Sequence, residues 1–207
     1  MPVQIRREAG YAQPERKMFS QLNHEYLIEQ IQHQGSESHN SGSSLRLRTS
    51  FSHPCKEIVI AVRPNANVEN GANRWTDFTY GSGENALFDP TRPAAGVGYN
   101  GSDPLRDAKI QLNATDRTSL MPAAYWGIVQ PYYHHTNIPT TGIYLYSFAL
   151  KPEEHQPSGT LNASRIEGLN VVMTLNTGTA GVTIFPFAVN YNVLRITSGM
   201  GGLAYAS

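Results

Sequence analysis

The sequence has a single cysteine, no excess of charge of either sign and no long apolar run. Cys55 has no partner with which to form an internal disulfide, which suits a reducing compartment. Lysine plus arginine equals aspartate plus glutamate, at 16 each, so no positive field attracts nucleic acid. This balance argues against a genome-packaging role, and we expect no nucleic-acid partner.

Membrane and export signals are also missing. No apolar run approaches the roughly 20 residues needed to span a bilayer, and the first residues, MPVQIRREAGYAQPERK, lack the apolar centre of a signal peptide. We therefore expect a soluble chain that is made inside the cell and does not insert into a membrane. Its 207 residues fit one domain with a stable core.

Catalytic motifs are missing as well. There is no nucleophile elbow, phosphate-binding glycine loop or Cys-His pairing. His134, His135, His155, Glu153 and Glu154 are possible metal ligands, but HxH and HExxH spacings are absent, and adjacent residues of a strand point to opposite faces. We predict no catalytic, cofactor or metal site. A cupin-like metalloenzyme is the alternative, and it requires histidines that converge on an ion.

What the sequence does have is short alternating segments separated by turn signals, which predict an all-β sandwich of about eight antiparallel strands with long inserted loops. Residues 116–130 give the one convincing helical segment, with Asp116 or Thr118 as its cap and Pro122 in its first turn. At most one or two short helices are expected. The expected strands are 26–32, 45–51, 57–63, 108–112, 143–150, 169–175, 182–187 and 188–197, with short strands around 75–80.

Residues 142–166 organise the rest of the chain. The strand 143–150 is apolar on both faces, which predicts a place at the centre of a packed sheet. Lys151 and Pro152 end it, because proline has no amide hydrogen for the ladder. A buried strand that delivers a long polar loop, here residues 151–165, is a common way to build a contact surface on a rigid frame.

This stretch also carries a family resemblance. SFALKPEEHQPSGTLNASRI resembles the signature of the major capsid proteins of nucleocytoplasmic large DNA viruses, which have two jelly rolls in tandem. HEYLIEQIQ, FSHPCKEIVIAVRP, LNATDRTS, QPYYHHTNIP and AVNYNVLRITSGMGGLAYAS are similar to the same family in the same order. The resemblance covers about residues 15–207 and implies that residues 24–207 form the second, C-terminal jelly roll. Residues 1–23 would be an N-terminal arm or a remnant of the preceding roll.

The resemblance implies a structural protein: a jelly-roll building block of a trimeric capsomer in an icosahedral shell. Its partners would be other copies and minor capsid proteins, its location the virion, and its assembly site the host cytoplasm. A single-jelly-roll minor capsid, spike or glycan-binding module is the alternative. Aromatic residues for a glycan site would be Trp75, Tyr80, Tyr132 and Tyr133.

Two groups of residues are candidates for subunit contacts. The charges of the loop either pair locally in a solvated turn or set register and partner choice between subunits, and we favour the interface because the resemblance is densest there. The tail offers too much apolar surface to leave wet. The candidates are Lys151, Glu153, Glu154, His155, Gln156 and Arg165 in the loop, and Met200, Leu203 and Tyr205 in the tail.

Overall fold

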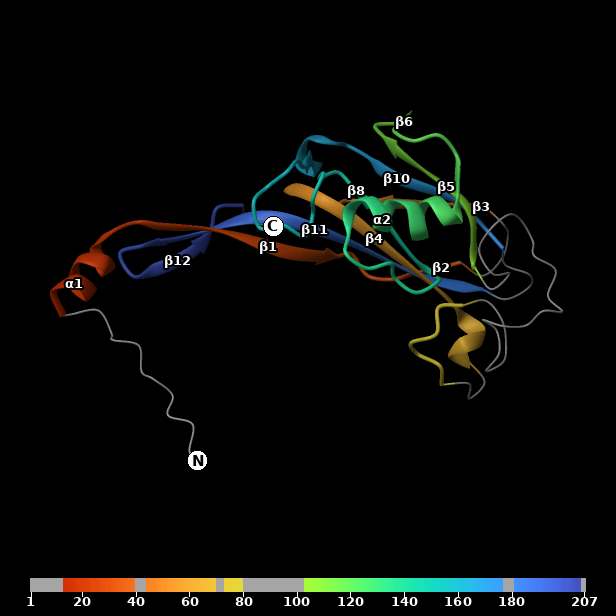
Figure 1. Ribbon diagram of the computed structural model, residues 1–207, viewed down its shortest axis with the longest axis horizontal. Coiled ribbons are helices and arrows are strands. Elements are labelled where there is room, and N and C mark those ends of the chain that lie inside the picture. Colours follow the sequence, from red (N-terminus) through yellow and green to blue (C-terminus); the bar gives the residue numbers. More distant parts are fainter. Residues whose placement is uncertain (1–12, 40–43, 70–72, 80–102, 177–180, 206–207) are drawn as a thin grey trace. The chain divides into compact units, whose positions relative to one another are not determined.

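The computed structural model describes residues 13–39, 44–69, 73–79, 103–176 and 181–205 (Figure 1). Contacts divide the chain into two compact units. Residues 29–191 form the sandwich unit, and residues 1–28 together with 192–207 form the terminal unit.

The strands form two antiparallel sheets. The first sheet has the order β1-β11-β4-β8, and the second has the order β3-β10-β5-β6. The main strands of the first sheet are β1 (His24–His33), β11 (Val182–Thr197), β4 (Pro54–Pro64) and β8 (Ile143–Ser147); β2 (Glu37–His39) and β12 (Met200–Leu203) pair with β11, and β9 (Leu161–Asn162) pairs with β4. The second sheet contains β3 (Ser44–Thr49), β10 (Leu169–Leu175), β5 (Leu105–Leu112), β6 (Thr115–Asp116) and β7 (Met121–Pro122), which pairs with β5.

The pairing of the strands is nested. β1 pairs with β11, β3 with β10, β4 with β8 and β5 with β6, while β1, β3, β4 and β5 alternate between the two sheets. This is one long antiparallel hairpin rolled into a two-layered sandwich, the topology of a jelly roll. The predicted jelly roll is confirmed.

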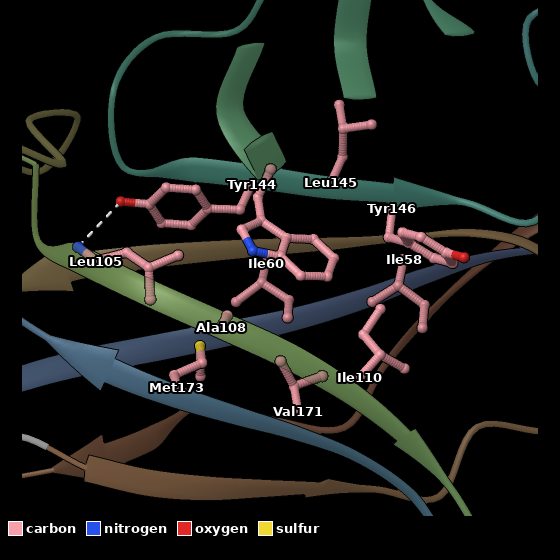
Figure 2. A pocket seen from close by; sticks show the side chains of 11 residues that line it. Ile58, Ile60, Leu105, Ala108, Ile110, Tyr144, Leu145, Tyr146, Val171 and Met173 are labelled. Carbon is pink, nitrogen blue, oxygen red and sulfur yellow. Dashed lines mark hydrogen bonds between the residues drawn. The ribbon is translucent and has the colours of Figure 1, made fainter. Parts of the chain in front are cut away.

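The two sheets pack face to face over an apolar core. β10 alternates as predicted, with Leu169, Val171, Met173 and Leu175 buried, and β3 buries every second residue in the same way. A cavity of about 20 Å³ remains between the sheets, lined only by apolar and aromatic residues (Figure 2). The lining surface is almost entirely apolar, which favours a dry cavity.

The helical segments differ from the prediction. They are α1 (Gln13–Gln21), η1 (Asn65–Asn67), the π-helical turn η3 (Tyr125–Val129), α2 (Gln130–His134) and η4 (Ala163–Arg165). α1 was not predicted. The segment predicted at 116–130 becomes helical only at Ala123, because Asp116 lies in β6, where it pairs with Lys109 of β5, and Pro122 lies in β7. Within the described residues, no helix is long and apolar enough to cross a membrane.

The position of β8 is a second correction. It lies at the end of the described path of its sheet, next to β4, and not at the centre. Both of its faces are nevertheless largely covered, because η3 and α2 pack against it. It ends at Ser147, three residues earlier than predicted, since the next two amides donate to the Lys56 carbonyl instead.

Other strand predictions were partly wrong. Residues 75–79 form turns and no strand, and Tyr80 lies outside the described residues. The two closing strands are one continuous strand, β11. Alternation along the predicted strand 108–112 would turn Gln111 toward water, but Gln111 is buried: its carbonyl accepts from Arg46 and its amide donates to Asp116.

Candidate functional site

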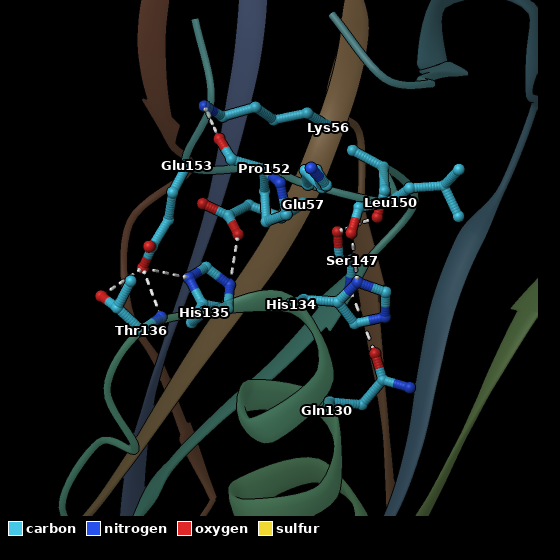
Figure 3. Close-up of polar contacts among 12 residues, drawn as sticks. Lys56, Glu57, Gln130, His134, His135, Thr136, Ser147, Leu150, Pro152 and Glu153 are labelled. Atoms are coloured by element: carbon cyan, nitrogen blue, oxygen red, sulfur yellow. Dashed lines mark hydrogen bonds and ion pairs between the residues drawn. The ribbon is translucent and has the colours of Figure 1, made fainter.

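The predicted contact loop, residues 151–165, follows the end of β8; its first part lies in loop 148–160, which connects β8 to β9. Loop 148–160 begins beside an irregularity in β4. Glu57 pairs with Val189, whereas Cys55 pairs with Asn190, so Lys56 is an extra residue in a β-bulge. A bulge breaks the strict alternation of side chains. The adjacent charged residues Lys56 and Glu57 consequently both reach the region of loop 148–160, and both are buried (Figure 3).

Lys56 fixes the loop from beneath. Its Nζ donates to the carbonyl of Pro152 at 2.6 Å and to Oε1 of Glu29, on β1, at 2.6 Å. The ammonium lies 5.5 Å from the centre of the Tyr191 ring, a favourable cation–π position. Its side chain is only 4% exposed. A buried charge needs such partners, since desolvation is otherwise very costly.

Glu57 begins a second chain of contacts. Its Oε2 lies 3.0 Å from Nε2 of His135, and Nδ1 of His135 lies 3.2 Å from Oε1 of Glu153 in the loop. The same Glu153 oxygen accepts from the backbone amide of Thr136 at 3.1 Å (Figure 3). One imidazole therefore bridges a carboxylate of the sheet and a carboxylate of the loop.

These contacts change the pKa values of His135 and Glu153, which together with Glu57 form the carboxylate–imidazole–carboxylate bridge. Hydrogen bonding to Glu57 raises the pKa of His135, with burial opposing it and the Glu57 and Glu153 charges adding to it. The Thr136 amide is the largest cause that lowers the pKa of Glu153. The bridge is thus strongest when the imidazole is protonated and both carboxylates are ionised.

The end of α2 completes the frame of the loop. His134 makes a 3.0 Å hydrogen bond through Nδ1 to the carbonyl of Leu150, and Oε1 of Gln130 accepts from the amide of Ser147 at 3.5 Å. Gln130 thereby bonds the last amide of β8, and His134 bonds the start of the loop that follows it.

The predicted loop residues fall into two groups. Glu153 is part of the bridge, whereas Lys151 and Glu154 form an exposed local pair at 2.9 Å. The remaining candidates, His155, Gln156 and Arg165, are exposed. Local pairing is therefore present at Lys151 and Glu154, and a role in subunit contacts stays a prediction.

The predicted tail residues lie in the terminal unit and are exposed: Met200 by 75%, Leu203 by 44% and Tyr205 by 46%. Residues 200–203 of the tail form β12, which pairs with the end of β11. The backbone of Tyr205 is held by Asn192, whose amide group makes hydrogen bonds of 2.9 and 3.1 Å to it.

The residues proposed for a metal site and for a glycan site do not converge on one place. His134 and His135 bind different partners, and His155 is exposed; in the described part of the chain, no group of three or more His, Cys, Asp or Glu residues has the arrangement of a metal site. Among the aromatic candidates, Trp75 packs on Arg63, while the exposed rings of Tyr132 and Tyr133 contact each other.

Sequence reasoning missed the two buried charges of the bulge. Residues 57–63 were correctly predicted as a strand, but β4 already begins at Pro54, so Lys56 and Glu57 both lie inside it. Two adjacent charges beside an apolar run are the one available signal, and they do not distinguish a bulge from an exposed strand end.

The fold is a jelly roll in which polar residues of β4 hold a surface loop. The family model of the large eukaryotic DNA virus major capsid protein matches residues 15–202, and the chain belongs to this family. The major capsid proteins of Paramecium bursaria Chlorella virus 1 and Phaeocystis pouchetii virus are 39% and 36% identical, each over 93% of this chain.

Solved structures agree with this assignment. The crystal structure of the VP54 protein of the same Chlorella virus, fitted into a reconstruction of the virophage Sputnik, superposes with a TM-score of 0.74 at 34% identity. The match covers 95% of this chain and 55% of that one. The two curated relatives are likewise covered over 51% of their length, so this chain spans about half the length of the relatives it matches.

Proposed function

We propose that this chain is a structural component of the capsid of a large DNA virus, forming one jelly roll of a capsomer. The observation that carries the proposal is the family match over residues 15–202, together with the rolled-hairpin topology that both sheets share. A rigid sandwich presents the same surfaces in every copy, and symmetry multiplies weak contacts into a stable shell.

The sandwich acts as the C-terminal roll, and the capsomer is a homotrimer in which a companion roll completes each subunit. Three subunits of two rolls each give a pseudo-sixfold outline that tiles an icosahedral shell. The balance of 16 basic and 16 acidic residues suits this packing, because like-charge repulsion between copies stays small.

The loop 151–165 and the tail provide the contacts between subunits. This loop suits the role because Lys56 holds its backbone at Pro152 and Glu57 holds its Glu153 side chain through His135, which lowers the entropy lost when a partner binds. The protein works in the virion after assembly in the host cytoplasm, with other copies and minor capsid proteins as partners. It needs no cofactor, catalyses no reaction, and contacts neither nucleic acid nor the membrane interior.

Native mass spectrometry of the protein from its natural source tests this function, because it reports both the mass of the mature chain and its assembly state. We expect chains of about twice this length, in keeping with the half coverage of the relatives, assembled as trimers. A 22.8 kDa monomer that never assembles would contradict the proposal and favour a single-roll binding module.

A further inference from the structure

A cleft of about 430 Å³ opens in the sandwich unit, at the end of β8 opposite to loop 148–160. One wall is formed by residues 76–79, in the segment that follows β4, and the other by residues 139–141, just before β8. Four threonines line it: Thr76 and Thr79 on the first wall, and Thr140 and Thr141 on the second. A volume of this size lies in the range of small-molecule sites.

A buried asparagine holds the first wall in place. Asn67 is 1% exposed, and its Nδ2 donates to the carbonyls of Asp77 and Thr79, at 2.8 Å each. The backbone carbonyl and Oδ1 of Asn67 accept from the amide and the guanidinium of Arg74, at 2.8 and 3.1 Å. This wall therefore keeps its shape without a ligand, although it contains neither helix nor strand.

A glycine joins the two walls at their base. Gly142 has a φ of +92°, and a Cβ added there would collide with the backbone carbonyl of Phe78. A residue without a side chain lets the two segments come this close. The Gly142 carbonyl accepts from the Val62 amide at 2.9 Å, which attaches the base of the cleft to β4.

The cleft presents hydroxyls that the protein leaves available. Thr79 donates its hydroxyl to Asp77 at 2.6 Å. The hydroxyls of Thr76, Thr140 and Thr141, in contrast, have no hydrogen-bond partner in the described part of the chain. Each threonine hydroxyl offers one donor and two acceptor positions, so these three can bind a ligand that has hydroxyls of its own.

Apolar surface lies in the same cleft. Phe78 and Pro139 line it together with the threonines, and their rings can pack against C–H groups of a ligand. A sugar ring combines both kinds of surface, because hydroxyls lie around its edge and C–H groups lie on its faces.

The charge of the cleft favours a neutral ligand. Among the described residues that line it, none is lysine, arginine or histidine. Oδ1 of Asp77 accepts from the amide and the hydroxyl of Thr79, and Oδ2 lies 3.6 Å from Nη1 of Arg74. An anionic ligand would thus meet a carboxylate and no cation of the lining, while a cation would meet a carboxylate that is already paired.

We propose that this cleft binds one ring of a neutral saccharide, whose hydroxyls bond the available threonines and whose C–H face packs on Phe78 and Pro139. None of the described aromatic candidates for a glycan site, Trp75, Tyr132 and Tyr133, lines it. The site adds a binding activity to the structural role. A single site of this kind is weak, but a shell with many copies holds a glycan-bearing surface through many simultaneous contacts.

NMR titration of the full chain, made in bacteria so that it carries no glycan, tests the proposal. The ligands are the methyl glycosides of glucose, galactose, mannose and fucose. At least one should shift the amide signals of residues 76–79 and 140–141 and bind with a Kd on the order of 1 mM, as expected for a ligand of this size.

Two variants locate the binding. The double variant Thr140→Val, Thr141→Val should bind about tenfold more weakly, because each lost hydrogen bond costs a factor of roughly 2 to 12. Thr174→Val is the matched control, since Thr174 is a half-buried threonine on the outer face of β10, and it should bind like the wild type. Both variants should keep the wild-type unfolding midpoint, which excludes misfolding as the cause of weaker binding.

Three results would overturn the proposal. The first is that no glycoside shifts these signals. The second is that the double variant binds as tightly as the wild type, which places the sugar elsewhere. The third is that glucuronic acid binds more tightly than glucose, which means that the site recognises charge. None of these results bears on the capsid function, which native mass spectrometry tests separately.

The same titration of protein from its natural source distinguishes two origins of the sugar. Binding equal to that of the bacterial protein means that the cleft takes its sugar from another surface. Binding that appears only after enzymatic deglycosylation means that a glycan of the capsid itself fills the cleft.

Discussion

The sandwich unit and the terminal unit differ in what they bury. The sandwich unit buries a continuous apolar core and even the ammonium of Lys56, whereas Asn192 is the one buried residue among those described for the terminal unit. The first region is stable through its own packing, whereas the described residues of the second bury little of their own surface. Substitutions in the sandwich unit should therefore change the free energy of unfolding, and those in the terminal unit should change association alone.

The largest effect is expected for Lys56→Met. The substitution keeps the length of the side chain but removes the donor to Pro152 and the partner of Glu29. Breaking a buried ion pair from one side costs about 3 kcal/mol, although Glu29 is 40% exposed and water will compensate part of this. Urea unfolding should show the loss, and hydrogen exchange should show faster exchange in loop 148–160.

Lys151→Met is the matched control, since Lys151 is an exposed lysine of the same loop that pairs with Glu154. It should leave the unfolding midpoint unchanged. If both variants lose the same stability, burial of Lys56 is not what holds the loop.

A second large effect should depend on pH. Asp103 is 4% exposed, accepts from the Leu105 amide and the Tyr144 hydroxyl, and has a pKa of about 6, raised mainly by burial. A carboxyl with a raised pKa stabilises fully below its unfolded pKa of about 3.9 and loses that contribution as pH rises through about 6. Wild-type stability should fall by roughly 2 to 3 kcal/mol from this group between about pH 4 and pH 7.

Asp103→Asn should flatten that part of the pH dependence, because the side chain no longer ionises. Chemical unfolding at a series of pH values measures the difference between the two proteins. Equal slopes would show that Asp103 ionises as easily in the folded chain as in the unfolded one.

The sequence predicted the periodic parts of the sandwich and little of what departs from periodicity. β3 and β10 were predicted with the correct faces because their apolar residues alternate strictly. The order of the strands required the family resemblance, since alternation carries no information on pairing partners. The bulge at Lys56 and the edge position of β8 depend on contacts between distant segments, so local pattern missed both. In the loop, the sequence pattern identified Glu153 as a candidate residue, but it did not identify the contacts that link Glu153 to His135 and His135 to Glu57.

A moderate gain in stability is expected from filling the cavity between the sheets. Val171 lines this cavity in the middle of β10, so Val171→Ile adds one methylene to empty apolar space (Figure 2). Burying a methylene contributes about 0.8 kcal/mol. Val172→Ile, on the other face of the same strand, is the control and should have a smaller effect. A less stable Val171→Ile variant would mean that the cavity is too tight for the added carbon.

A smaller, local effect should follow the protonation of His135. Its pKa is raised, so its contribution is complete below the unfolded value of about 6.5 and is lost as pH rises through the folded value. Glu153, with a lowered pKa, contributes above about pH 4.3 and loses this as pH falls. Loop 148–160 should therefore exchange more slowly at about pH 5.5 than at about pH 8, after correction for intrinsic rates.

His135→Gln should remove this difference, whereas His155→Gln, at an exposed position of the same loop, should retain it. Persistence of the difference in His135→Gln would assign the pH response to another group.

The smallest effect is expected in the terminal unit. Phe19→Ser and Met200→Ser change side chains that are 48% and 75% exposed, so the free energy of unfolding of the dilute chain should stay within about 0.5 kcal/mol of wild type. Thermal unfolding at low concentration measures this, and the same variants should associate more weakly at high concentration. A large loss of stability in the dilute chain would mean that these residues pack within one molecule, and the contrast between the two units would then fail. Unchanged stability with weakened association would show that the apolar surface of the unit serves contact between molecules.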